Sequence, residues 1–168
     1  RVLRVLSALA VIGLFVALWK WRGLAAMEPI VEGGQRRWLL AIGESIAVSL
    51  AAQWVLYLLP WPLLALFGRT APFCSVFSLR PCVGSNAELS RAAVLAVRLL
   101  PPVLVGAALW FALARVPLVW FWPVAMASAG CTVAALGMVY DTVRVLQVPG
   151  RATFCDLGIA IQVYREVS

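Results

Sequence analysis

The amino-acid sequence predicts an all-α integral membrane protein with about four transmembrane helices and a short, partly extended C-terminal tail. Of its 168 residues, 64% are apolar and only 12% are charged, and the mean hydropathy is +0.96. Soluble domains contain roughly 25% charged residues, so about half of the usual ionic surface is missing. This composition excludes a soluble enzyme, a secreted disulfide-stabilised miniprotein and a disordered chain.

Four long apolar segments predict the membrane-spanning helices. A hydrocarbon core about 30 Å thick requires about 20 helical residues, and the sequence offers such segments at about 2–19, 38–59, 92–113 and 116–140. The first segment ends at an aromatic and basic belt, residues 19–22, which is typical of a membrane interface. Because the nearest small-x-small step follows that belt, we expect residues 1–22 to form an uncleaved anchor and residues 36–168 to form the main membrane domain.

The connections between these segments follow from prolines and from their lengths. Pro60 and Pro62 predict the end of the second helix, with residues 63–67 lying along the interface. A re-entrant second segment is the alternative. Two residues, Ala114 and Arg115, separate the third and fourth segments, which predicts a tight antiparallel hairpin.

The distribution of basic residues predicts the orientation. Four spans place both termini on the same side of the membrane. That side carries eight basic residues and the other side carries five, and the side with more basic residues is usually cytoplasmic. The inner set is Arg1, Arg4, Arg69, Arg80, Arg91, Arg144, Arg151 and Arg165, and the outer set is Lys20, Arg22, Arg36, Arg37 and Arg115. We therefore expect a bacterial inner membrane protein with cytoplasmic termini. The net charge of +7 indicates attraction to anionic lipid, since the sequence has no clustered basic face for nucleic acid.

Residues that support catalysis are scarce. Histidine is absent, and the cysteines at 74, 82, 131 and 155 include no C-x-x-C pair, so neither a zinc site nor a Ser-His or Cys-His arrangement is predicted. We expect no enzyme activity, no metal and no cofactor. Cys74 and Cys82 share one loop and can form a bridge in an oxidising compartment, but the favoured topology predicts free thiols.

Two polar segments lie outside the spans. In the loop at 68–90, Ser85 or Asn86 followed by Glu88 predicts an N-cap for the third helix. The tail at 141–168 turns near residue 149, and its alternating apolar residues, Ile159, Ile161 and Val163, predict a short strand. An isolated strand is marginal, so we expect it to pair with a partner surface or with the loop at 68–90.

Three short motifs give the chain a family resemblance. They are Arg37-Trp38-Leu39-Leu40-Ala41-Ile42-Gly43-Glu44, then Gly68-Arg69-Thr70 with Phe77-Ser78-Leu79-Arg80 and Leu89-Ser90-Arg91-Ala92, and Gly150-Arg151-Ala152-Thr153-Phe154-Cys155-Asp156-Leu157. In this order they resemble the RDD membrane domain over residues 36–168, with Glu44 in place of that family's Asp. The resemblance implies a helical membrane domain, ion transport in some members, and a closing acid at Asp156.

Two charges inside predicted spans are candidate functional residues. Glu44 lies seven residues into the second span, about 10 Å deep at 1.5 Å per residue, where a carboxylate costs about 2.5–3.5 kcal/mol unless it is paired or protonated. It can serve as a proton or cation site, or form a structural pair with Arg37, two turns away, or with Arg98 of the third span.

Asp141 and Arg144, at the end of the fourth span, predict an interfacial ion-pair cluster with Arg151 and Asp156.

Small and polar residues predict close helix contacts. Ser45, Ser49 and Gln53 recur at every fourth position of the second span, and Gly130 and Ala134 do so in the fourth. Such residues let backbones approach and hydroxyl groups bond across helices. A water path is the alternative for the first stripe.

The sequence features are compatible with two functions. A non-catalytic accessory subunit, packed against other membrane-protein subunits in the lipid bilayer, is favoured by the small-residue faces. A small RDD-type ion or solute transporter, with Glu44 and Arg98 on its path, is favoured by the intramembrane charges and by the resemblance.

Overall fold

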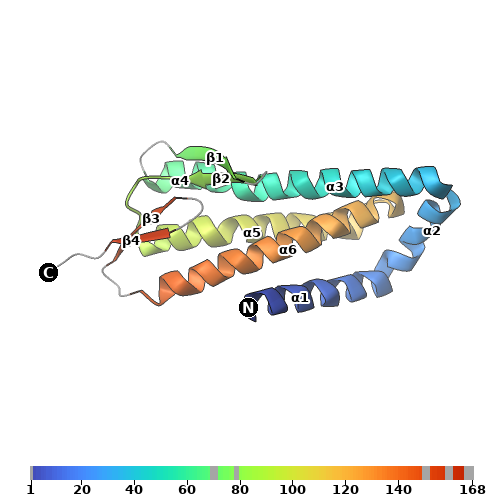
Figure 1. Ribbon diagram of the computed structural model, residues 1–168, viewed down its shortest axis with the longest axis horizontal. Coiled ribbons are helices and arrows are strands. Elements are labelled where there is room, and N and C mark those ends of the chain that lie inside the picture. The colour runs from blue at the N-terminus through green and yellow to red at the C-terminus, as the bar shows by residue number, and fades with distance from the viewer. Residues whose placement is uncertain (1, 69–71, 78–79, 149–151, 158–160, 165–168) are drawn as a thin grey trace. The chain divides into compact units, whose positions relative to one another are not determined.

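A computed structural model describes residues 2–68, 72–77, 80–148, 152–157 and 161–164 (Figure 1). The helical elements in the first half are α1 (Val2–Leu18), the π-helix η1 (Trp19–Gly23), α2 (Leu24–Glu32), α3 (Gly34–Leu58) and α4 (Pro60–Gly68). The second half contains β1 (Phe73–Phe77), β2 (Arg80–Gly84), α5 (Arg91–Arg115), α6 (Leu118–Leu146), β3 (Thr153–Asp156) and β4 (Ile161–Tyr164). The predicted turn at residue 149, Arg151, Ile159 and the Cys82 side chain lie outside the described residues.

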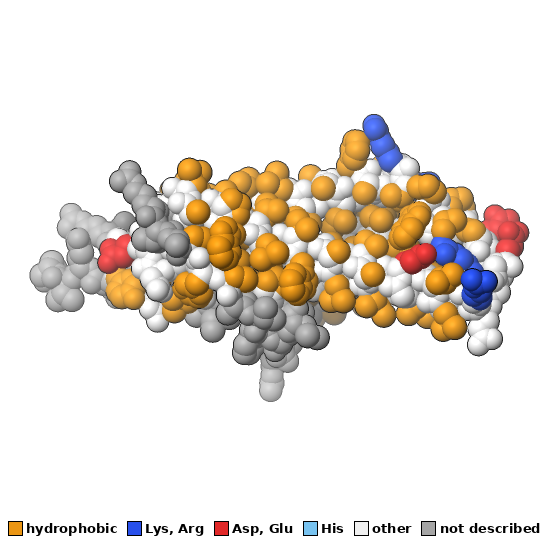
Figure 2. Space-filling view, turned by 90° about the horizontal axis from the view of Figure 1, so that it is seen from above, with side chains coloured by type: hydrophobic (Ala, Val, Ile, Leu, Met, Phe, Trp, Pro, Cys, Tyr) orange, Lys and Arg blue, Asp and Glu red, His pale blue; other side chains and the backbone are white. Residues whose placement is uncertain are grey.

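The predicted fold class is confirmed. Among the described residues, four helical runs are long and apolar enough to cross a membrane: Ala8–Glu32, Gly34–Phe67, Arg91–Arg115 and Leu118–Leu146. The helices expose large aliphatic side chains, such as Leu39 at 65% and Leu66 at 72%. Figure 2 shows this apolar exterior along α3. A surface of this kind suits a lipid environment.

The first helix continues beyond its predicted end. The belt at 19–22 lies inside a helical run, because η1 joins α1 to α2 without a break. Aromatic and basic side chains mark an interface but do not stop a helix, since their backbone still forms hydrogen bonds. The run ends instead at two glycines. Gly33 closes α2, and Gly34, with φ of 62°, takes the left-handed conformation that glycine adopts without strain.

The break at Pro60 is small. α3 ends at Leu58, and α4 begins at Pro60 after the single residue Leu59, whose N–H still donates to the carbonyl of Val55. Proline at the first position of a helix loses no hydrogen bond. The predicted interfacial segment at 63–67 is therefore part of a helix, and the run Gly34–Phe67 is long enough to cross a membrane by itself.

The predicted hairpin between the third and fourth spans is present. α5 ends at Arg115 and α6 begins at Leu118. The N–H of Val116 donates to the carbonyl of Ala112, and the N–H of Trp120 donates to the carbonyl of Pro117. These bonds satisfy backbone groups on both sides of the tight connection.

The chain divides into two compact units, each with its own apolar core. Unit 1 comprises residues 1–53 and 104–136, and unit 2 comprises 54–103 and 137–168. Phe121 and Leu113 are fully buried in unit 1, and Phe154 and Val94 are fully buried in unit 2. The predicted division into an anchor at 1–22 and a domain at 36–168 is a different one and stays a prediction.

Unit 2 contains two antiparallel hairpins that the sequence did not fully predict. β1 pairs with β2, in a segment expected to be a loop, and β3 pairs with β4. The chain just before α5 also pairs with β3, because Leu89 and Phe154 exchange backbone hydrogen bonds and the N–H of Ser85 donates to the carbonyl of Asp156. The strand predicted around Ile161 and Val163 is therefore present as β4, but it pairs with β3 of the tail itself, and β3 rather than β4 contacts the loop at 68–90.

The N-cap prediction for the third span was wrong by several residues. Ser90, directly before α5, accepts a hydrogen bond from the N–H of Ala93 at 3.3 Å, which is the geometry of an N-cap. Ser85 is buried and instead accepts from the N–H of Ala87 at 3.1 Å. The backbone hydrogen bonds of Ser85 and Leu89 to β3 keep this segment out of the helix, so the helix starts later, at Arg91.

Candidate functional site

Arg37 and Glu44 form an ion pair on α3 in unit 1. Arg37 Nη1 lies 3.1 Å from Glu44 Oε1, and Nη2 lies 3.3 Å from Oε2, so the guanidinium contacts both oxygens as a fork. Nη2 also lies 3.5 Å from the carbonyl oxygen of Val119 on α6. The side chains keep 19% and 22% exposure. Of the two partners considered for Glu44, the structure shows Arg37.

Arg98 and Asp156 form the second ion pair, in unit 2. Arg98 Nη2 of α5 donates to Asp156 Oδ1 at the end of β3. The pair is much less accessible than the first one, with side-chain exposures of 13% for Arg98 and 2% for Asp156. Asp156, singled out by the family resemblance, therefore fastens the β3–β4 hairpin to a membrane helix.

Cys155 lies beside this pair in β3. Its Sγ donates to the carbonyl oxygen of Ser85 at 3.1 Å, and the residue is 4% exposed. Burial raises the pKa of the Cys155 thiol above its usual value, and the negative charges of Asp156 and Glu88 raise it further. The thiol therefore stays protonated at neutral pH, which makes it a poor nucleophile.

The predicted cluster around Asp141 and Arg144 is not formed as expected. Within the described residues, Arg144 Nε donates to Tyr140 Oη at 2.9 Å, and the guanidinium lies 5.1 Å from the centre of the Tyr140 ring. Tyr140 is four positions away on the same helix face, where a long side chain reaches it more easily than it reaches the short Asp141. Asp156 is buried with Arg98 rather than exposed beside Arg144.

The small and polar stripes predicted on the second and fourth spans approach each other at one point. A methyl group added at Gly130 of α6 would lie 2.9 Å from Gln53 Nε2 of α3, so the end of the Gln53 side chain lies against the α6 backbone at this glycine. Ser45 contributes differently, because its hydroxyl donates to the carbonyl of Ala41 in its own helix at 2.6 Å. Ser49 and Ala134 are half-buried, and their part in a helix contact stays a prediction.

Three other glycines in the unit 1 helices face open space. A methyl group added at Gly13 of α1, Gly43 of α3 or Gly106 of α5 would meet no atom within 4 Å. Glycine inside a helix costs about 0.5–1 kcal/mol relative to alanine. No close approach within the described residues explains these three positions.

Two arginines that the sequence assigned only to topology cap helix ends. Arg22 of η1 donates to the carbonyls of Leu113 and Val116 at 2.9 and 3.2 Å, at the C-terminus of α5. Arg91 donates to the carbonyl of Val148, which follows α6. The last carbonyls of a helix lack internal partners and attract cations. Each of these contacts joins residues that are far apart in the chain. The neighbouring sequence therefore could not predict them.

The arrangement favours structural over chemical roles for the candidate charges. Glu44 and Asp156 each contact an arginine of the same chain. The described residues contain no group of three His, Cys, Asp or Glu side chains that is close enough to hold a metal ion. Comparisons of the chain with family models, with curated proteins and with solved structures give no match.

Proposed function

We propose that this protein is a non-catalytic, multi-span accessory subunit that packs against other membrane proteins and stabilises a larger complex. The observation that favours this role most is the set of open glycines, Gly13, Gly43 and Gly106, on three different helices. Small residues at the surface of a membrane helix allow a second helix to approach its backbone closely. Their cost to helix stability is offset when a partner helix covers them.

The ion pairs support the same proposal. Arg37 forms an ion pair with Glu44, and Arg98 forms one with Asp156. Arg22 and Arg91 donate hydrogen bonds to backbone carbonyls at helix ends. These polar groups hold the chain together, so the lipid-facing surface is left mainly apolar. Charges that are paired inside the chain and an apolar outer surface suit a rigid scaffold that performs no reaction.

The first experiment measures the mass at which the 18.2 kDa chain migrates after native membranes are solubilised in a mild detergent. Co-migration with unrelated proteins at fixed stoichiometry supports the accessory-subunit proposal and identifies the host complex. Migration alone, or as a homo-oligomer, contradicts it.

Leucine substitutions sharpen this experiment. Gly43→Leu and Gly106→Leu place a branched side chain where a partner helix would lie, so they should release the chain from the complex without unfolding it. Ala108→Leu is the matched control, because Ala108 is exposed on α5 two positions from Gly106 and thus on a different face. Equal effects of all three substitutions would contradict a glycine-lined contact.

An RDD-type transporter is the second candidate. It is favoured by the position of Glu44 inside a candidate span together with the 22% exposure of its side chain, which leaves room for exchange with an ion. Glu44→Gln, tested in reconstituted vesicles with the fold verified by circular dichroism, should abolish flux if Glu44 lies on the path. Unchanged flux and unchanged association would remove Glu44 from both functions.

The orientation is part of the proposal. With both termini in the bacterial cytoplasm, the turn at Arg115 is extracytoplasmic and the segment at Asn86 is cytoplasmic. A membrane-impermeant thiol reagent should label Arg115→Cys, but not Asn86→Cys, in intact cells, above the background of the native chain. Both positions are exposed. The reverse labelling pattern would invert the topology.

A further inference from the structure

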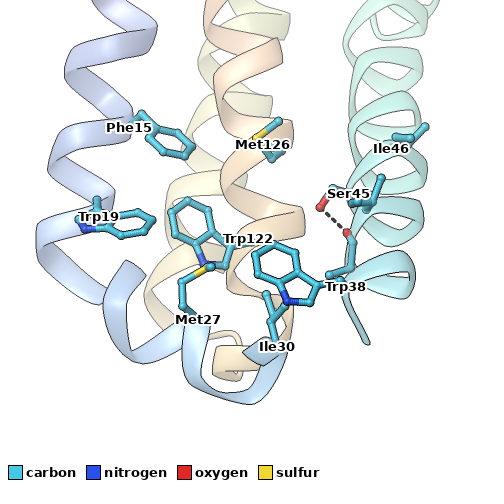
Figure 3. Close-up of a pocket in the computed structure, with 11 residues that line it drawn as sticks. Phe15, Trp19, Met27, Ile30, Trp38, Ser45, Ile46, Trp122 and Met126 are labelled. Atoms are coloured by element: carbon cyan, nitrogen blue, oxygen red, sulfur yellow. Dashed lines mark hydrogen bonds between the residues drawn. The ribbon is translucent and has the colours of Figure 1, made fainter. Parts of the chain in front are cut away.

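A groove with aromatic walls opens in unit 1. It has a volume of about 360 Å³, and α1, η1, α2, α3 and α6 contribute its lining. We call it the aromatic groove, and Phe15, Trp19, Met27, Trp38, Trp122 and Met126 are its largest lining residues. Figure 3 shows the Trp122 ring in the middle of these side chains. Its size lies in the range of small-molecule binding sites, which runs from about 300 to 1,000 Å³.

Trp122, which lines the aromatic groove, carries a buried polar atom without a partner. Trp122 is 8% exposed, and its Nε1 is buried without a hydrogen-bond acceptor. The ring is held in place by neighbours, because its centre lies 5.1 Å from that of Phe15 and 5.5 Å from those of Trp19 and Phe121. A buried N–H group without an acceptor is costly, and most buried indoles have one. The fixed donor indicates a ligand with an oxygen acceptor.

The one hydroxyl in the lining does not compete for that acceptor. Ser45 donates to the carbonyl of Ala41 in its own helix, as the dashed line in Figure 3 shows. The other lining side chains are aliphatic, aromatic or thioether groups, and the indoles of Trp19 and Trp38, at 37% and 42% exposure, are open to the surroundings, so Trp122 carries the buried donor. A suitable ligand is therefore a long apolar molecule with an acceptor at one point and no charge inside the groove.

The residues around the aromatic groove have the composition of a membrane interface. Trp19 is followed by Lys20 and Trp21 of η1, and Trp38 is preceded by Arg36, in the pattern of an interfacial belt. Lys20 and Arg36 are exposed, and so are Glu28 and Glu32 of α2. Exposed charges of both signs beside an apolar groove suit a headgroup that carries phosphate and amine. The ester carbonyls of a phospholipid lie at the same depth, between headgroup and acyl chains.

We infer that the aromatic groove binds one acyl chain of a membrane glycerophospholipid, and that the ester carbonyl of this chain accepts a hydrogen bond from Trp122 Nε1. The acyl chain lies against the aromatic and methionine side chains, whose rings and flexible thioethers adapt to a bent hydrocarbon. This inference is independent of the proposed function, since a subunit and a transporter can both hold a structural lipid.

The test compares an ester lipid with an ether lipid. Protein purified in mild detergent and stripped of lipid is titrated with 1-palmitoyl-2-oleoyl phosphatidylethanolamine or with its dialkyl ether analogue, and bound lipids are counted by non-denaturing mass spectrometry. The ether analogue keeps the chains and the headgroup but lacks the carbonyls. We expect one preferred site in the wild type, with the ether lipid bound about three- to tenfold more weakly, as the loss of one hydrogen bond predicts.

Variants assign the effect to Trp122. Trp122→Phe keeps a ring but removes the N–H, so ester and ether lipids should bind equally. Trp120→Phe is the matched control, because Trp120 lies two positions earlier on α6 and is 43% exposed, and it should keep the wild-type preference. Ser45→Phe should fill the aromatic groove and weaken binding of both lipids.

Three results would overturn the inference. They are equal binding of ester and ether lipids by the wild type, an ester preference that survives Trp122→Phe, and purification of the native chain with a quinone in place of phospholipid. The wild-type comparison decides the matter even if a variant fails to fold.

Discussion

The two ion pairs differ in where they lie and in what they join. In unit 1, Arg37 and Glu44 are seven residues apart on one helix and keep 19% and 22% exposure. In unit 2, Arg98 and Asp156 are 58 residues apart, and Asp156 keeps 2%. The first pair stabilises a conformation that the helix already has, whereas the second joins a helix to a hairpin. We therefore expect the second pair to matter far more for stability.

The largest expected effect comes from breaking the buried pair. Asp156→Ala leaves the Arg98 charge buried without its carboxylate, which should lower the free energy of unfolding by about 3–5 kcal/mol. Chemical denaturation in detergent, followed by circular dichroism, measures this loss. Glu88→Ala removes an exposed carboxylate from the same unit and should cost much less. Similar losses for the two variants would contradict a dominant role for the pair.

A double substitution separates lost packing from an uncompensated charge. In the variant with Arg98→Met and Asp156→Leu, no charge is left buried, so most of the stability should return. If the double variant is as unstable as Asp156→Ala, the hydrogen-bond geometry of the pair is needed rather than its charge balance.

The second prediction compares two glycines, one in each unit. A methyl group at Gly84 would lie 2.6 Å from the carbonyl carbon of Leu157 and 2.8 Å from its oxygen, whereas one at Gly130 would meet the end of the flexible Gln53 side chain. Gly84→Ala should therefore cost about 1–3 kcal/mol. Gly130→Ala should be nearly neutral, because alanine regains about 0.5–1 kcal/mol of helix stability. Thermal unfolding of the two variants tests this order, and a reversed order would contradict it.

The third prediction concerns alkaline pH. Because the pKa of Cys155 is raised in the folded state, the unfolded chain loses this proton first as the pH rises. Stability should be unaffected below about pH 8.5, the usual thiol pKa, and should then fall by about 1.4 kcal/mol per pH unit up to the folded-state pKa. Cys155→Ala should show a smaller fall than the wild type in an unfolding series from pH 7 to 10. An identical pH profile for the variant would assign the effect to another group.

The smallest effect is expected for the accessible pair. Glu44→Gln keeps a side chain that can accept from Arg37, and Arg37 retains the carbonyl of Val119, so the free energy of unfolding should change by less than about 1 kcal/mol. The same denaturation assay measures it. If Glu44→Gln lowered the free energy of unfolding as much as Asp156→Ala, the two ion pairs would contribute equally to stability. That result would contradict the difference proposed between the units.

The sequence predicted features that depend on nearby residues. Long apolar segments gave the four spans, and the spacing of two helical turns placed Glu44 within reach of Arg37. The β1–β2 hairpin was missed, because its strands have only five residues each and β2 contains Pro81 and Gly84, residue types that are depleted in strands. The pair between Arg98 and Asp156 was also missed, since the contact depends on how a hairpin packs on a helix. Helix ends were displaced where tertiary pairing, as at Leu89 and Phe154, overrides the local cap signal.

The Arg98–Asp156 pair also imposes an order on biosynthesis. Translation adds about 5–20 residues per second, so the 58 residues between the partners take about 3–12 s to make. During that interval α5 holds a guanidinium whose carboxylate does not yet exist. Arg98 must meanwhile extend its head toward water or lipid phosphate. Closure of the pair is therefore a late step of biosynthesis, which follows the synthesis of β3.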